Sequence, residues 1–65
     1  MKQALRKLAE ECGELTQAAI KVHDGKPWKQ ELTAEAGDVI VCIRKLVKLG
    51  IIDKKQLNKR IKEKA

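Results

Sequence analysis

Two long amphipathic runs dominate this chain and constrain its fold most strongly. In the first run, from Leu5 to Val22, apolar residues alternate in steps of three and four positions. In the second run, from Leu32 to Val47, apolar residues recur with a similar helical spacing. Such spacing is typical of a helix that buries one face, so it predicts two amphipathic helices. The residues predicted to face the core are Leu5, Leu8, Cys12, Leu15, Ala19 and Val22, then Leu32, Ala36, Val39, Ile40, Ile43, Leu46 and Val47.

The segment 24–27, Asp-Gly-Lys-Pro, separates the two runs and predicts a tight turn. Gly25 suits the left-handed position that follows a helix, and Pro27 suits the first turn of the next helix. We therefore expect helices over residues 3–23 and 27–49. Because the turn is short, the two helices must run antiparallel and form a hairpin.

A short third helix is predicted after the hairpin. Gly50 ends the second helix, and Asp53 followed by Gln56 resembles a capping box at the start of another. Leu57 and Ile61 are its core-facing candidates, while the rest of the segment is strongly basic. The predicted fold class is therefore all-α, with an antiparallel helical hairpin and a short C-terminal helix.

The chain is short for an independent fold. Its 65 residues predict a single domain, 1–65, and Trp28 is the one aromatic residue. A domain of this size buries only about 60% of its unfolded surface and is marginally stable alone. We therefore expect the hairpin to assemble into a helical bundle as a homo-oligomer.

The two cysteines, Cys12 and Cys42, are too few for a disulfide framework and lack the spacing of a zinc knuckle. We expect them to be buried, reduced thiols. No apolar run approaches the roughly 18 residues of a membrane span, and no signal peptide is visible. These features favour a cytoplasmic protein without a membrane partner.

Two pairs of acidic residues stand out in a chain whose net charge is +6. Glu11 and Glu14 lie one helical turn apart, and so do Glu35 and Asp38. At about 100° per residue, both pairs are offset from their apolar stripes by similar angles in the same rotational sense. In an antiparallel hairpin, such offsets bring all four carboxylates to one edge. Glu14 is expected nearly level with Glu35, and Glu11 with Asp38.

Carboxylates gathered in this way are the oxygen ligands that Mg²⁺ prefers, and Mn²⁺ is a second possibility. The alternative is a solvated acidic face whose charge is balanced by neighbouring lysines. Lys7 and Lys45 fall on the same edge, beyond Glu11 and Asp38. They are candidates for binding outer phosphate oxygens, or for pairing with the nearby acids.

These motifs resemble the MazG-like family of all-α nucleoside triphosphate pyrophosphohydrolases. The family carries E-E-x-x-E on one helix and E-x-x-D on the next. Here "LAEECGEL" supplies Glu10, Glu11 and Glu14, and "AEAGDVI" supplies Glu35 and Asp38. The resemblance extends over residues 5–50, which is most of the chain.

The resemblance implies Mg²⁺-dependent hydrolysis of a nucleoside triphosphate to the monophosphate and pyrophosphate. It implies that Glu11, Glu14, Glu35 and Asp38 are both the metal ligands and the catalytic residues. One of these carboxylates would also orient or deprotonate the attacking water. Members of the family are usually dimers or tetramers, so the implied partners are the triphosphate substrate and further copies of the chain.

Two other functions remain open at this point. The first is a non-catalytic helical oligomer of the same fold that binds a nucleotide or a partner protein. The second is binding of nucleic acid by the basic segment that follows Asp53. A single aromatic residue offers almost no platform for stacking bases, so nucleic acid is the less favoured partner.

Overall fold

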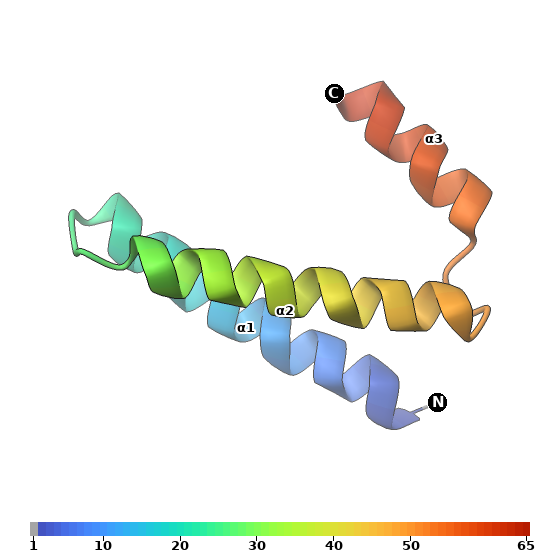
Figure 1. Ribbon diagram of the computed structural model, residues 1–65, viewed down its shortest axis with the longest axis horizontal. Helices are drawn as coiled ribbons and strands as arrows, with labels where there is room; N and C mark the ends of the chain where they lie inside the picture. The colour runs from blue at the N-terminus through green and yellow to red at the C-terminus, as the bar shows by residue number, and fades with distance from the viewer. Residues whose placement is uncertain (1) are drawn as a thin grey trace.

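The computed structural model describes residues 2–65, which form three helices (Figure 1). These are α1 (Lys2–His23), α2 (Lys29–Lys48) and α3 (Lys54–Lys64). In Figure 1, α1 and α2 run antiparallel and pack along their length, while α3 turns away from them. The predicted all-α hairpin with a short C-terminal helix is confirmed. None of the helices within residues 2–65 combines the length and the apolar composition that a membrane span requires.

The end of α1 is closed by two hydrogen bonds around a left-handed glycine. Gly25 has φ 84°. Its N–H donates to the carbonyl of Val22 at 3.0 Å, and the N–H of Lys26 donates to that of Lys21 at 2.9 Å. This is the Schellman arrangement, which satisfies carbonyls that the helix leaves unpaired. The predicted role of Gly25 is thus confirmed.

The start of α2 differs slightly from the prediction. Trp28 is its N-cap residue, with φ −107° and ψ 25°, and its N–H donates to the carbonyl of Lys26 at 2.8 Å. The helix therefore begins at Lys29. Pro27 precedes the helix and does not occupy its first turn, because the backbone closes a small loop there before it becomes helical.

The face of α1 that packs on α2 is rotated from the predicted stripe. Ala18 is almost fully buried, as is Glu11, which is only 6% exposed. Four residues of α1 that were predicted to face the core are exposed instead: Leu5, Cys12, Ala19 and Val22. One partner helix covers only part of the broad apolar side of α1, and α2 covers the part that includes Leu15. The prediction of two buried thiols is wrong for Cys12, since only Cys42 is partly covered.

The face of α2 follows the predicted stripe more closely. Leu46 is fully buried and Val39 is nearly so. The other predicted positions are half-buried, except Ile40, which is 48% exposed. Ile40 lies at the margin of the stripe, where α1 does not reach.

The third helix begins where the sequence indicated. Gly50 has φ 78°, and the side chain of Asp53 accepts a hydrogen bond from the backbone N–H of Gln56 at 2.9 Å. Leu57 is half-buried, but Ile61 is 55% exposed. The prediction that Ile61 enters the core is wrong, because α3 projects away from the hairpin (Figure 1).

Candidate metal centre

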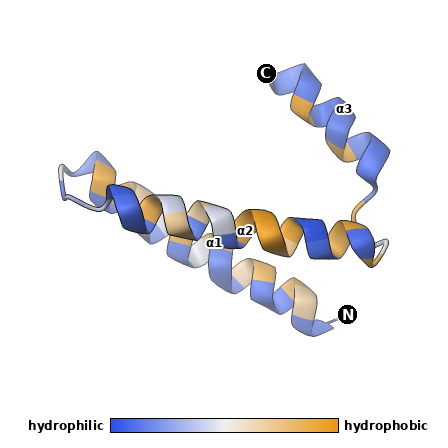
Figure 2. Cartoon of the chain, in the orientation of Figure 1, coloured by the Kyte–Doolittle hydropathy of each residue, from blue (hydrophilic) through white to orange (hydrophobic). Residues whose placement is uncertain are grey.

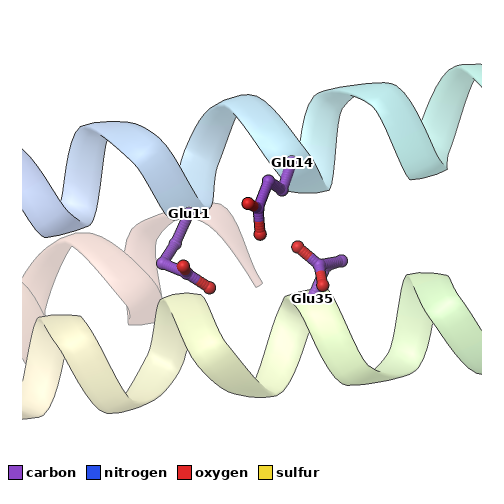
Figure 3. Close-up of side chains that lie close together, drawn as sticks. All are labelled: Glu11, Glu14 and Glu35. Carbon is purple, nitrogen blue, oxygen red and sulfur yellow. The ribbon is translucent and has the colours of Figure 1, made fainter.

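Three carboxylates from the two long helices meet at one edge of the hairpin. Glu11 and Glu14 come from α1, and Glu35 comes from α2 (Figure 3). Each residue contributes one carboxylate oxygen, and these three oxygens all lie within 4.8 Å of one another. We call these three residues the carboxylate cluster. Its members lie on the edge that helical spacing predicted, because the two helices run antiparallel.

The rotation of α1 draws one member of the cluster into the helix interface. Glu11 is buried, Glu35 is half-buried and Glu14 is exposed. Burial of an ionised carboxylate is unfavourable unless a partner offsets the lost solvation. Lys7, one turn earlier on α1, supplies this partner through an ion pair of 3.2 Å with Glu11. The hydrogen bond and the charge of Glu11 raise the pKa of Lys7 in turn.

Glu35 carries the most perturbed carboxyl group of the cluster. A hydrogen bond shared with Glu14, loss of solvent, and the charges of Glu14, Asp38 and Glu11 raise its pKa to about 7. That hydrogen bond requires a proton, because two ionised carboxylates offer only acceptors. The Oε2 atom of Glu35 is buried and has no hydrogen-bond partner among the described residues. If that proton leaves, the negative charges of the cluster repel one another, and a bound cation would offset this repulsion.

Asp38, the fourth predicted ligand, lies beside the cluster and is not one of its three members. It lines a shallow pocket of about 230 Å³ together with Lys7, Glu11, Val41 and Cys42. Asp38 and Glu11 thus share one hollow, in agreement with the prediction that they lie at similar positions along the hairpin axis. Asp38 is exposed, so its side chain is free to turn toward a ligand in this hollow.

A second hollow of about 250 Å³ lies on the turn side of the cluster. Glu14 and Glu35 both line this hollow, in agreement with the prediction that they lie at similar positions along the hairpin axis. Its lining is Glu14, Gln17, Ala18, Trp28, Glu31 and Glu35. The ammonium of Lys21 lies 5.4 Å from the centre of the Trp28 ring, within the range of a cation–π contact. The sequence analysis did not predict that Gln17 and Cys42 line the site. Gln17 lies one helical turn after Glu14, and Cys42 lies one turn after Asp38, so this spacing could have identified them.

The two lysines predicted to bind phosphate differ in their surroundings. Lys7 lines the same hollow as Glu11 and Asp38, and its side chain is 62% exposed despite the ion pair. Lys45 is exposed, lines neither hollow beside the acids, and forms no ion pair within residues 2–65. The structure therefore brings Lys7, and not Lys45, into the candidate site.

The donor set fits a hard divalent cation. All three cluster members offer carboxylate oxygens, and one of these oxygens is buried without a partner. Oxygens bound to one Mg²⁺ lie roughly 3 to 4 Å apart, given metal–oxygen distances of about 2.1 Å. The three oxygens of the cluster all lie within 4.8 Å of one another, so small side-chain rotations suffice to place them around one cation.

Comparisons of the chain with models of known protein families, with curated proteins and with solved structures found no match.

Proposed function

We propose that this chain is an Mg²⁺-dependent nucleoside triphosphate pyrophosphohydrolase of the MazG-like kind. The observation that carries the proposal is the carboxylate cluster with its buried, unpartnered Glu35 oxygen. A purely solvated acidic face would not bury Glu11 or leave the pKa of Glu35 near neutrality. The four acids that the resemblance implies as metal ligands, Glu11, Glu14, Glu35 and Asp38, lie at or beside this cluster.

In this proposal, Glu11, Glu14 and Glu35 hold the cation, and Asp38 completes the acidic edge from the neighbouring hollow. Bound Mg²⁺ supplies charge neutralisation for the phosphate oxygens and an ordered site for water. Mn²⁺ is expected to substitute, because it accepts the same oxygen ligands.

The protein's own groups then orient water and bind the substrate. A general base must have a carboxylate oxygen that is not occupied by the cation. Asp38 lies beside the cluster and is not one of its three members, so we assign it the proton from the attacking water. The water oxygen forms a bond to phosphorus, and the bond to the departing pyrophosphate oxygen breaks. Lys7 lies in the adjoining hollow and can donate hydrogen bonds to outer phosphate oxygens.

Assembly into a helical bundle is part of the same proposal. The described hydrophobic core consists of Ala18, Val39 and Leu46, which is small for a stable domain. A dimer or tetramer would bury more apolar surface and could supply further walls to the shallow hollows beside the acids.

The test is product analysis by ion-exchange chromatography after incubation with a panel of nucleoside triphosphates and Mg²⁺. The expected products are monophosphate and pyrophosphate, and both should disappear when a chelator is added. Glu14→Gln should abolish turnover without unfolding the protein, because Glu14 is exposed. The matched control is Glu10→Gln on the same helix, since Glu10 is exposed and pairs with Arg6 at 3.6 Å.

Folded, metal-binding protein that turns over none of these substrates would refute the enzyme proposal. Tight Mg²⁺–nucleotide binding without turnover would instead support the non-catalytic helical oligomer. Activity retained by Glu14→Gln would show that the site has been assigned to the wrong residues.

A further inference from the structure

The third helix carries almost all of the chain's net positive charge. Six of the eleven residues of α3 are Lys or Arg and one is Glu, so the net charge of this helix is +5. The whole chain has a net charge of +6, which leaves +1 for all other residues. Figure 2 shows α3 as mostly hydrophilic, whereas hydrophobic residues lie along both α1 and α2. Every residue of α3 is exposed except Leu57, so this charge faces solvent.

Three of the cations of α3 lie in one row. At about 100° per residue, Lys55, Lys59 and Lys62 fall within about 60° of one another around the helix axis. Lys55 and Lys62 are about 10 Å apart along that axis. Together with Asn58, the three lysines line a shallow hollow of about 350 Å³. We call Lys55, Lys59 and Lys62 the lysine row.

The acids nearest the lysine row have other partners. Glu63 lies about 40° from Lys59 around the axis, but it pairs with Arg60 at 3.9 Å. Asp53 accepts a hydrogen bond from the backbone N–H of Gln56. Within residues 2–65, no member of the lysine row forms an ion pair. The row therefore presents three unpaired ammonium groups to solvent.

A row of separated cations is complementary to an extended polyanion. Duplex nucleic acid carries about one negative charge per 1.7 Å of its axis, so several phosphates lie along the roughly 10 Å of the row. A lysine ammonium binds phosphate oxygens as a point charge. Because α3 projects away from the hairpin that holds the carboxylate cluster (Figure 1), a polyanion can lie along α3 without meeting those acids.

The residues of α3 favour a duplex over a single strand or a membrane surface. Single strands are bound largely by stacking of bases on aromatic side chains. Trp28 is the one aromatic residue, and the 20 residues of α2 place it about 30 Å from the start of α3. A duplex is bound through its phosphates and needs no such platform. Leu57 and Ile61 are the only apolar residues of α3, which is little for insertion into lipid.

We propose that the lysine row binds the phosphate backbone of duplex nucleic acid without reading its sequence. The three ammonium groups contact phosphate oxygens, and the side-chain amide of Asn58 adds a neutral donor beside them. The interaction requires neither the carboxylate cluster nor a bound cation. It is therefore a second binding property of the chain, independent of the proposed hydrolysis.

The first measurement is fluorescence anisotropy of a short labelled duplex, prepared once as DNA and once as RNA, titrated with the full chain in the presence of a chelator. Three phosphate contacts predict that the logarithm of the affinity falls with the logarithm of the salt concentration, with a slope of about −2.7 or steeper. The affinity for at least one duplex should therefore fall at least about 40-fold between about 50 and about 200 mM salt. Failure to bind either duplex, or an affinity that does not change with salt, would overturn the proposal.

Two matched substitutions on α3 test whether the lysine row makes the contact. Lys59→Gln removes one of three contacts, so it should reduce the slope by about one third and weaken binding about tenfold at about 50 mM salt. Lys64→Gln removes the same charge about 180° from Lys55 and should change the affinity by less than about twofold. Circular dichroism checks that both variants remain helical. Equal weakening by the two variants would show that binding follows net charge alone, and would overturn the assignment to the lysine row.

Two controls separate the proposal from other modes of binding. Sedimentation with vesicles of phosphatidylcholine and phosphatidylserine tests a membrane surface, and a higher affinity for these vesicles than for both duplexes would overturn the proposal. Repeating the anisotropy titration with Mg²⁺ in place of the chelator tests the carboxylate cluster. Binding should persist in chelator, where hydrolysis is absent. Duplex binding that occurs only with Mg²⁺ would place the contact at the carboxylate cluster and refute the role of α3.

Discussion

Binding of a divalent cation to the carboxylate cluster is expected to strengthen with pH. The pKa of Glu35 is raised to about 7, first by the hydrogen bond shared with Glu14 and then by loss of solvent. A cation and a proton compete for the same oxygen atoms, because a carboxylic acid must lose its proton to act as a ligand. Raising the pH through neutrality therefore removes the competitor.

The size of the effect follows from this pKa. With a pKa of about 7, Glu35 is about nine-tenths protonated at about pH 6 and about nine-tenths ionised at about pH 8. The apparent dissociation constant should therefore be about tenfold lower at the higher pH. An ordinary glutamate, with a pKa of 4.5, would be ionised at both values and would show almost no change.

Isothermal titration calorimetry with Mn²⁺ measures both the affinity and the protons released. Repeating each titration in buffers of different ionisation enthalpy gives the number of protons displaced per cation. We expect about nine-tenths of a proton at about pH 6 and about one-tenth at about pH 8. Glu35→Gln should bind more weakly and lose the pH dependence, because the titrating group is gone.

Equal affinity at both pH values, with no proton released, would refute the reasoning for Glu35. The matched control is Glu31→Gln, one turn earlier on α2, since Glu31 lines the hollow but does not belong to the carboxylate cluster. It should keep the pH dependence. A pH effect that survives in Glu35→Gln would assign the displaced proton to another residue.

Three further predictions concern stability. In the presence of a chelator, the melting temperature should fall as pH rises from about 4.5 to about 7 and should then level off. The reason is that the raised pKa of Glu35 makes the folded state bind more protons than the unfolded state in that pH range. Thermal scans in which the melting temperature rises over the same range would contradict this prediction. Leu46→Ala removes the fully buried side chain and should cost about 2 to 5 kcal/mol, whereas Val41→Ala at a largely exposed position should change stability by less than about 0.5 kcal/mol, as urea unfolding would measure. Asp53→Ala removes the cap of α3 and should cost that helix about 1 kcal/mol, seen as faster amide exchange within α3 while the hairpin is unchanged.

The local features of the fold were predictable because they depend on residues close together in the sequence. Gly25 and Gly50 have positive φ values where the helices end, and Asp53 caps α3 through its neighbour Gln56. The convergence of Glu11, Glu14 and Glu35 was also predictable, since two helices and a short turn leave little freedom in direction. Their role in catalysis and in binding Mg²⁺ stays a prediction.

The rotation of α1 was less predictable from periodicity alone. The apolar side of α1 is wider than one partner helix can cover, so the pattern permits more than one packing face. Which face of α1 packs on α2 depends on contacts between residues far apart in the chain, including the contacts that bury Ala18 and those that bury Leu46. This choice buries Glu11, exposes Cys12 and leaves Asp38 just outside the carboxylate cluster.

Local sequence patterns were sufficient to predict the three helices, their turns and the edge on which the acids gather. These properties follow from helical periodicity and from local hydrogen bonding at the helix ends. Tertiary packing determines which acids lie closest together and which apolar residues stay uncovered, and it directs α3 away from the hairpin. These outcomes depend on how far one helix rotates and slides against another, which packing of side chains determines and local spacing does not.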